Sequence, residues 1–290
     1  MTDALRLVVA LLLFFATAAA KAHELHLERD AQEGTISVYR EGEDEPIVTQ
    51  HARAHFRPYI HPIVAPDGRG ILTEFSPDHH KHQTGLYWGF TGLNGRDYFH
   101  NPGEGFWKRN HLKIIKQQGD TVAWQTSYDL LDPEGVSVLT EIQSWELHAM
   151  DGEYLMDLSW EGIAHLPVVV ERGRYGGMFL RMAWRKGMNA MATNSSGASN
   201  RDAEGKKAVW LNLRMQVEGR EDQAHITIFD HPKNKGFPQA WRVDRQFGVG
   251  PSRARSGQWK IAKGDKEVIR HRLVVHTGKF DANRINEKWV

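Results

Sequence analysis

Apolar and polar residues alternate along most of this chain with a period of two, not the roughly 3.6-residue period of a helix. The stretch "YLMDLSWEG" shows the pattern, because Tyr154, Met156, Leu158 and Trp160 fall on one face and mainly polar residues fall on the other. Successive side chains of a strand point to opposite faces of a sheet. This stretch therefore predicts a strand with one buried face.

Similar runs recur at hairpin spacing along the chain. They are "TISVYR", "LYWGFTG", "TVAWQTSYDLL", "VSVLTEIQSWELH", "HITIFD" and "VIRHRLVVHTG". Turn sequences such as Asn94-Gly95 and Asp151-Gly152 separate them. The pattern predicts an all-β fold, a sandwich or barrel of antiparallel strands. Only the tail "DANRINEKWV" is helical in pattern, with Asp281 as its N-cap.

The N-terminus has the pattern of a cleavable signal peptide over residues 1–22. Arg6 precedes an apolar run from Leu7 to Ala16, and the small-residue site Ala20-Lys21-Ala22 follows. The apolar run is well short of the roughly 20 residues that a membrane-spanning helix needs. We therefore expect export to the periplasm or the extracellular space, with residues 23–290 forming a single β-sandwich domain and no membrane span after cleavage.

Composition narrows the function. The chain has 290 residues, of which 40% are hydrophobic, enough for one large domain with its own core. Its 37 basic and 36 acidic residues leave a net charge of +1, which argues against nucleic acid as a partner. It has no cysteine, which excludes disulfides, thiolate metal sites and a cysteine nucleophile.

The stretch "SPDHHKHQTGLYWGF" concentrates titratable groups just before a predicted strand. In an extended chain His80 and His82 lie on one face, where they could share a divalent metal ion, while His79 and Lys81 face the other way. The same imidazoles could instead serve as general acid and base. A solvated polar loop is the structural alternative, and a metal site would need a third ligand from elsewhere.

The segment "HFRPYIHPIVAPDG" places Arg57, Tyr59 and His61 on one edge of an extended chain. A guanidinium and a phenol are suited to hold a carboxylate or a sugar hydroxyl. Pro58 and Pro62 indicate an edge strand or a bulged strand, where sites are often built. The alternative is an ordinary edge strand whose polar residues face water.

Two further fragments follow predicted strands. "NGRDYFHNPGEG" supplies Asn94, Asp97 and His100 after a tight turn, and "FDHPKN" supplies Asp230 and His231. Residues at strand ends are well placed for a shared cleft. A turn-forming or capping role is the alternative for Asp230 and His231.

Several familiar catalytic signatures are absent. The chain has no G-x-S-x-G, Walker A, G-x-G-x-x-G or H-E-x-x-H motif, which removes most support for serine hydrolase, nucleotide-dependent and zincin chemistry. Cleavage after Ala22 would leave His23 at the mature N-terminus, where its free amine and imidazole could chelate copper.

The motifs "RPYIHPIVAPDG", "DHHKHQTGLYWGF", "NGRDYFH", "IFDHP" and "LVVHTGKFDANRI" occur in this order. With them the chain resembles, over about residues 30 to 288, a bacterial family of unknown function often labelled "methane oxygenase PmoA". A membrane monooxygenase subunit would need several spanning helices, which this sequence lacks. The resemblance implies a β-sandwich similar to the galactose-mutarotase-like supersandwich, and a setting among exported carbohydrate-utilisation proteins.

The resemblance also implies site residues. The family's motifs fall here on Arg57, Tyr59, Asp78, His79, His82, Asn94, Asp97, Asp230 and His231. Two departures stand out. Many relatives read D-H-P-H-H-R where this chain has "DHHKHQ", and an acidic Lys-Glu-Gly-Gly run is replaced by "RYGG" with Tyr175.

The favoured interpretation is an exported enzyme that acts on a saccharide by epimerisation, lyase-type proton abstraction or hydrolysis. In it, an aspartate such as Asp97 or Asp230 holds a catalytic imidazole in the useful tautomer. The predicted catalytic residues are His79, His82, Arg57, Tyr59 and His61. The predicted substrate-binding residues are Asn94, Asp97, Trp88, Asp230, His231 and Trp241. His80 and His82 are the predicted ligands of a divalent metal ion.

Two alternatives remain open. One is a non-catalytic carbohydrate-binding protein in which Trp88, Trp107 and Trp241 stack on sugar rings. The other is a copper-binding redox protein that uses His23. For both the enzyme and the carbohydrate-binding protein, the expected ligand is a small molecule or an oligosaccharide.

Overall fold

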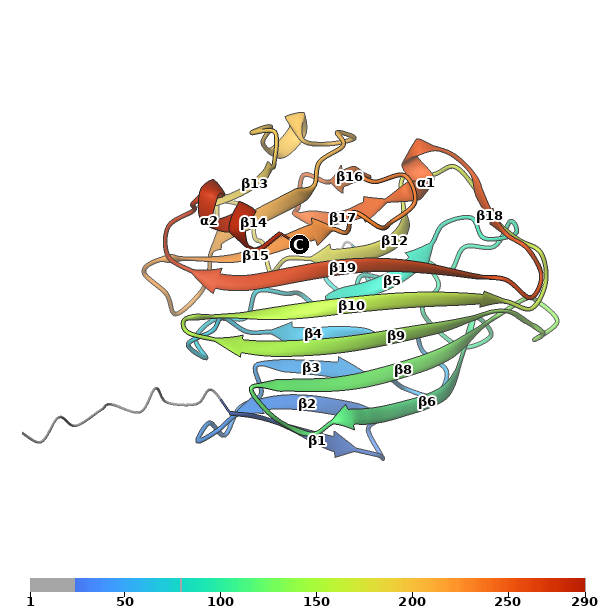
Figure 1. The fold of residues 1–290 in the computed structure, drawn as a ribbon, viewed down its shortest axis with the longest axis horizontal. Coiled ribbons are helices and arrows are strands. Elements are labelled where there is room, and N and C mark those ends of the chain that lie inside the picture. Colours follow the sequence, from blue (N-terminus) through green and yellow to red (C-terminus); the bar gives the residue numbers. More distant parts are fainter. Residues whose placement is uncertain (1–23, 79, 290) are drawn as a thin grey trace, which may run out of the picture.

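Residues 24–78 and 80–289, the part of the chain that the computed structural model describes, form two large antiparallel sheets and a small two-stranded sheet (Figure 1). The nine-stranded sheet has the order β16 (Ala240–Val243), β17 (Gly248–Ser252), β12 (Gly176–Arg181), β5 (Leu86–Phe90), β4 (Tyr59–Ile63), β3 (Val48–His51), β2 (Thr35–Arg40), β1 (Leu25–Asp30), β7 (Gln118–Gly119). The eight-stranded sheet has the order β13 (Ala190–Asn194), β14 (Trp210–Gln216), β15 (Gln223–Asp230), β19 (Lys266–Thr277), β10 (Glu153–Ala164), β9 (Ser137–Met150), β8 (Thr121–Leu131), β6 (Trp107–Lys116). The small sheet pairs β11 (Val168–Val170) with β18 (Trp259–Ile261), and the short helices are η1 (Asn200–Asp202), α1 (Arg253–Ser256) and α2 (Ala282–Glu287).

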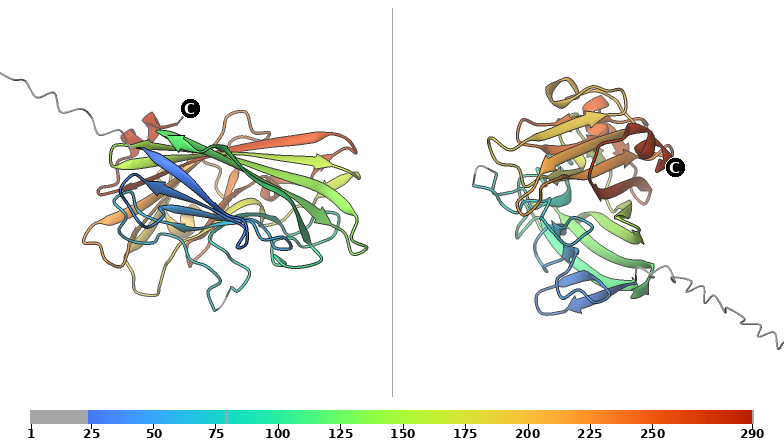
Figure 2. Two further views of the ribbon diagram at one scale, coloured as in Figure 1. Left: turned by 90° about the horizontal axis from the view of Figure 1, so that it is seen from below. Right: turned by 90° about the vertical axis from the view of Figure 1, so that its left-hand side faces the viewer.

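The two large sheets pack face to face as the layers of a sandwich (Figure 2). Trp88 of β5 stacks on Trp160 of β10, with ring centroids 4.7 Å apart and planes at 9°. The Trp124 indole of β8 donates a hydrogen bond of 3.2 Å to the Gln50 side chain of β3. The predicted all-β sandwich is confirmed.

The period-two pattern assigns side chains to faces as expected. Along β10, Tyr154, Met156, Leu158 and Trp160 are buried, and Asp157 is partly exposed on the opposite face. The predicted strands "TISVYR" and "TVAWQTSYDLL" coincide with β2 and β8.

The predicted C-terminal helix is confirmed as α2. Its N-cap, Asp281, accepts hydrogen bonds from the backbone N–H groups of Asn283 at 2.9 Å and Arg284 at 3.3 Å. Ile285 packs with Phe229 of β15 in an apolar cluster on the outer face of the eight-stranded sheet. Capping and packing together stabilise this helix, because a helix of so few residues is only marginally stable in isolation.

The indoles that were predicted to stack on sugar rings lie in the core. Trp88, Trp107 and Trp241 are at most 1% exposed. Trp107 donates to the carbonyl oxygen of Asn101 and Trp241 to that of Ala208. The sugar-stacking role is therefore corrected for all three, because a stacking platform must present its ring face to solvent.

No helix within residues 24–78 and 80–289 is long and apolar enough to cross a membrane. The predicted signal peptide, the hypothetical copper ligand His23 and the catalytic candidate His79 lie outside the described residues.

Candidate functional site

The outer face of the nine-stranded sheet carries a patch of aromatic side chains. Because neighbours on a strand alternate, Tyr87 of β5 points outward where Trp88 points into the core. Tyr87 lies between Tyr59 of β4 and Phe179 of β12 in the strand register. The aromatic patch consists of Tyr59, Tyr87, Phe99 and Phe179, with Phe56 and Tyr175 packed against them.

An aspartate and a histidine form a hydrogen-bonded pair at one side of the aromatic patch. Asp97 Oδ2 lies 2.7 Å from His100 Nδ1, and Asp97 Oδ1 accepts from the backbone N–H groups of Phe99 and His100. An ionised carboxylate only accepts hydrogen bonds, so His100 carries a proton on Nδ1. In the neutral ring this leaves Nε2 as a free lone pair, the state that a general base requires. The His100 side chain is 43% exposed.

His82 lies next to this pair. Its ring centroid is 4.5 Å from that of His100 and 5.7 Å from that of Phe99. Burial, reinforced by the positive charges of His100 and Arg57, lowers the pKa of His82 to about 4. His82 is therefore neutral at pH 7. Asp97, His100 and His82 are called the histidine cluster below.

Arg57 is buried and donates hydrogen bonds to the backbone that carries the histidine cluster. Its guanidinium is fully buried and donates to the carbonyl oxygens of Phe99 and His82, at 2.6 Å each, and to the Thr84 hydroxyl at 3.3 Å. It also lies 3.6 Å from the centre of the Tyr87 ring. The prediction that Arg57 grips substrate is corrected, because these contacts join the segments before and after β5 and leave it no exposed surface.

A second group of rings flanks the other side of the aromatic patch. His51 stacks on Tyr59, with centroids 4.6 Å apart, and its Nε2 donates to the carbonyl oxygen of His61 at 2.8 Å. His61 Nδ1 lies 2.9 Å from the Thr73 hydroxyl. Burial lowers the pKa of His61 to about 4, and the charge of His51 adds to this effect. His61 is neutral at pH 7.

A large cavity opens beside His61. It has a volume of about 1010 Å³ and is lined by His61, Thr73, Glu74, Phe75, Ile71 and Arg185, among others. Phe75 and Ile71 are 42% and 48% exposed, and Glu74 is paired with Arg185 at 2.7 Å. The Phe75 ring lies 5.3 Å from Tyr59 and 6.0 Å from His61. This His61 cavity therefore adjoins the aromatic patch and combines apolar surface with charged groups.

The structure thus brings together Tyr59, His61, His82 and Asp97 on one face, but separates them from three other predicted residues. Asn94 sits in a turn, where its side chain bonds to the backbone of Pro167 and Val169. Asp230 is the last residue of β15 in the eight-stranded sheet and His231 follows it, so the prediction of a cleft shared with the Asn94 segment is wrong.

Asp230 has a structural role. It is fully buried and accepts hydrogen bonds from the Asn234 side chain and the Gln239 backbone, at 2.7 Å each. Burial raises the pKa of Asp230 to about 6. This is the capping and turn role that was the alternative for Asp230.

The proposed metal ligands His80 and His82 have ring centroids 5.7 Å apart. Within the described ranges, no group of three or more histidine and acidic residues is arranged to hold a metal ion. His79 lies outside those ranges, so the metal site stays a prediction.

Several residues at this face escaped assignment from the sequence. His51 and Phe75 stand in no motif. The pairing of β3 with β4 brings His51 to Tyr59, and the Phe75 ring lies 5.3 Å from that of Tyr59. Tyr175 stacks on Phe99, with centroids 4.2 Å apart, and its hydroxyl accepts a 3.3 Å bond from Arg242. The one local signal that marked His100 was Asp97, three residues before it in the sequence.

Fold and site together define a β-sandwich protein with a histidine- and aromatic-lined outer face. The chain belongs to the family of unknown function DUF6807, whose model matches residues 33–290, in agreement with the predicted membership of an uncharacterised family. A search of curated protein sequences finds no match to it.

Solved structures share a low level of similarity with this chain. The GH36 α-galactosidase AgaB from Geobacillus stearothermophilus aligns with a TM-score of 0.42 and 6% identity, covering 87% of this chain and 41% of that one. A galactose mutarotase related enzyme from Lactobacillus acidophilus aligns with a TM-score of 0.39 and 7% identity, over 87% and 97%. The Slr1438 protein from Synechocystis sp. PCC 6803 gives 0.40 and 8%, over 87% and 95%. This chain spans about two fifths of the galactosidase's length.

Proposed function

We propose that this protein is an exported enzyme that moves protons on a saccharide or sugar derivative, with the histidine cluster as its acid/base centre. The observation that carries the proposal is the 2.7 Å contact of Asp97 Oδ2 with His100 Nδ1, with the His82 ring 4.5 Å from that of His100. His100 is the general base, Asp97 is its positioning residue, and His82 is the second proton-transfer group.

The electrostatics suit this division of work. Two imidazolium ions 4.5 Å apart would repel each other, and the lowered pKa of His82 keeps it neutral when His100 takes up a proton. A proton abstracted by His100 then meets the charge of Asp97, which stabilises the imidazolium without taking the proton itself. Epimerisation and lyase-type elimination both need such a base beside a group that can return or donate a proton.

A saccharide fits the surroundings of the cluster. Phe56 and Tyr175 at the margin of the aromatic patch are partly exposed, and the His61 cavity of about 1010 Å³ on the other side of the patch is large enough for an oligosaccharide. Phe75 and Ile71 supply exposed apolar surface, while Glu74 and Arg185 supply hydrogen-bonding groups for hydroxyls.

The test is turnover of a panel of monosaccharides and oligosaccharides in D₂O, followed by NMR. Proton abstraction from carbon appears as deuterium uptake, and elimination or hydrolysis appears as new product signals. We expect conversion by the wild type, loss of conversion in His100→Gln, and no change in the control His26→Gln, whose ring lies on β1 away from the site. Saturable sugar binding by the wild type without conversion would instead establish a non-catalytic binding protein.

Export belongs to the same proposal and is supported by the signal-peptide pattern of residues 1–22. Mass spectrometry of the protein purified from the periplasm and the culture medium should show a chain that begins at or near His23. Recovery of full-length chain from the cytosol alone would contradict export.

A further inference from the structure

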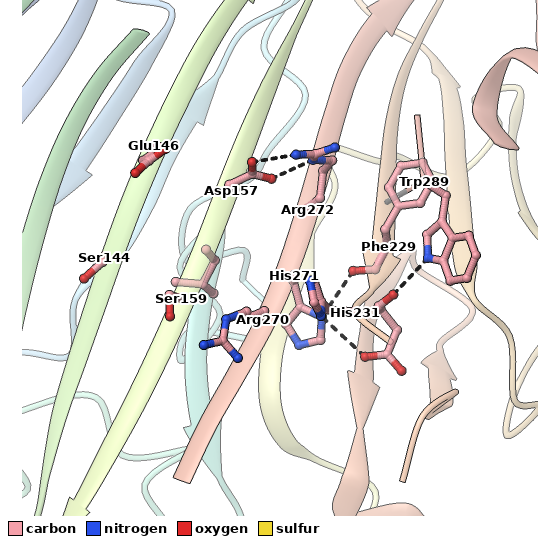
Figure 3. A pocket seen from close by; sticks show the side chains of 12 residues that line it. Ser144, Glu146, Asp157, Ser159, Phe229, His231, Arg270, His271, Arg272 and Trp289 are labelled. Atoms are coloured by element: carbon pink, nitrogen blue, oxygen red, sulfur yellow. Dashed lines mark hydrogen bonds and ion pairs between the residues drawn. The ribbon is translucent and has the colours of Figure 1, made fainter. Parts of the chain in front are cut away.

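A separate cavity of about 270 Å³ lies on the outer face of the other sheet, away from the aromatic patch (Figure 3). Its floor is formed by neighbouring strands β9, β10 and β19, which contribute Ser144, Glu146, Asp157, Ser159, Arg270 and Arg272. His271, between the two arginines, points inward to 6.1 Å from Trp88, so both arginines point outward. This Arg270 cavity is independent of the histidine cluster.

Strand register arranges the floor in two rows. The first row holds Glu146, Asp157 and Arg272, which are cross-strand partners. Arg272 donates from Nε and Nη2 to the two oxygens of Asp157 at 2.7 and 2.8 Å. This bidentate pair, with the nearby His148, lowers the pKa of Asp157 to about 2. The hydrogen-bonding groups of Arg272 and Asp157 are therefore already used by each other.

The second row is not satisfied. It places Ser159 beside Arg270 in the register of β10 and β19. The backbone of Arg270 bonds to the Asn234 side chain, but its guanidinium makes no hydrogen bond or ion pair with any residue in the described part of the chain. The Arg270 guanidinium and the Ser159 hydroxyl thus present unused donors to the cavity (Figure 3).

Two further residues complete the walls. His231 Nδ1 accepts a 3.1 Å bond from the Lys233 backbone N–H, so in its neutral form His231 carries its proton on Nε2 as another donor. The Trp289 indole is 38% exposed and lies parallel to Phe237, with centroids 5.9 Å apart. The cavity therefore combines hydrogen-bond donors with one aromatic wall.

The charges of the lining select the ligand. Arg270 and Arg272 are offset by Glu146 and Asp157, and the lining also holds Asp230, whose carboxylate already accepts from Asn234 and Gln239, so the site has no excess positive charge that would favour a dianion such as phosphate. A single carboxylate matches the fork of one free guanidinium, with the serine and histidine donors beside it. The volume, near the lower end of small-molecule sites, suits one sugar ring.

We propose that the Arg270 cavity is a second ligand site that binds a monoanionic sugar acid, with its carboxylate on Arg270 and Ser159 and its ring against Trp289. The site is a binding site without assigned chemistry. It stands whether or not the histidine cluster is catalytic.

The test is calorimetric titration of the mature wild-type protein with D-glucuronate and with D-glucose at millimolar concentrations. We expect saturable binding of glucuronate and none of comparable affinity for glucose. Arg270→Gln should weaken glucuronate binding roughly tenfold or more, because it removes a charge-assisted pair of hydrogen bonds. Arg270→Lys should recover part of the affinity, and quenching of Trp289 fluorescence should follow the same order.

Arg29→Gln is the matched control, since Arg29 is an exposed arginine on β1 of the opposite sheet. It should bind glucuronate like the wild type, and Ser159→Ala provides a milder second variant if Arg270→Gln does not fold. Absence of glucuronate binding, equal affinity for glucose, or unchanged affinity in both Arg270→Gln and Ser159→Ala would each overturn the proposal. Loss of binding in His100→Gln with retention in Arg270→Gln would also overturn it.

Discussion

The guanidinium of Arg57 donates a hydrogen bond from Nη2 to the carbonyl oxygen of His82 at 2.6 Å. The same side chain bonds to the carbonyl oxygen of Phe99 from Nη1, also at 2.6 Å. One buried side chain thus ties the segment before β5 to the segment after it. This connection fixes the backbone on which His82 and His100 approach each other.

Arg57→Gln should therefore disorder the histidine cluster as well as destabilise the fold. The substitution leaves buried carbonyl oxygens without donors, which we expect to lower the free energy of unfolding by about 2–4 kcal/mol. Amide hydrogen exchange should speed up most at residues 82–84 and 98–100. An equal increase in the exchange rate across the whole chain, with no larger increase at these two segments, would contradict the connecting role of Arg57.

The Asp97–His100 contact predicts a tautomer. In the wild type, ¹⁵N NMR at neutral or higher pH should find the proton of neutral His100 on Nδ1, because Asp97 accepts from it. Asp97→Asn should shift the population toward the Nε2–H form. On any substrate found in the sugar panel, the same variant should lower kcat/KM by roughly 10²–10⁴-fold.

His26→Gln serves as the reference for both measurements. An unchanged His100 tautomer in Asp97→Asn would show that Asp97 does not position the ring.

Glu141 predicts a pH dependence of stability. Its carboxylate is fully buried in the core, where it accepts from Trp160 at 2.7 Å and from Gln143 at 2.8 Å. Burial outweighs these two bonds and raises the pKa of Glu141 to about 7. The folded state therefore holds this proton more tightly than the unfolded state does. The resulting stabilisation is complete below the unfolded pKa and is lost as the pH rises through about 7.

The glutamine side chain of Glu141→Gln cannot ionise. The difference in free energy of unfolding between this variant and the wild type should therefore shift by about 2 kcal/mol in favour of the variant as the pH rises from 5 to 8. Urea unfolding of both proteins at the two pH values measures this difference. A constant difference across the pH range would mean that Glu141 titrates as it does in the unfolded chain.

The cap of α2 is the most local of the predictions. Asp281→Ala removes the acceptor for the N–H groups of Asn283 and Arg284 and should cost about 1 kcal/mol in urea unfolding. Asp281→Asn keeps an acceptor and should lie near the wild type. Equal destabilisation by both substitutions would indicate a role for the charge of Asp281 that capping does not explain.

Local patterns determined much of the fold. Alternation along "YLMDLSWEG" was enough to place Trp160 in the core and Asp157 outside, since a strand has no other way to bury one face. Asp281 marked the start of α2 because capping depends on residues two and three positions ahead. The contact of Asp97 with His100 is equally local, within a single turn.

Tertiary structure decided which groups meet and which stay apart. Period-two alternation put Arg57 and Tyr59 on one face, but covering that face with the Phe99 segment buried Arg57 completely. Asp230 and His231 share a sequence signature with strand-end sites, yet β15 joins the eight-stranded sheet and carries them to the opposite side of the core. Strand partners far apart in sequence are chosen by burying both inner faces at once, a condition that no single segment of the chain contains.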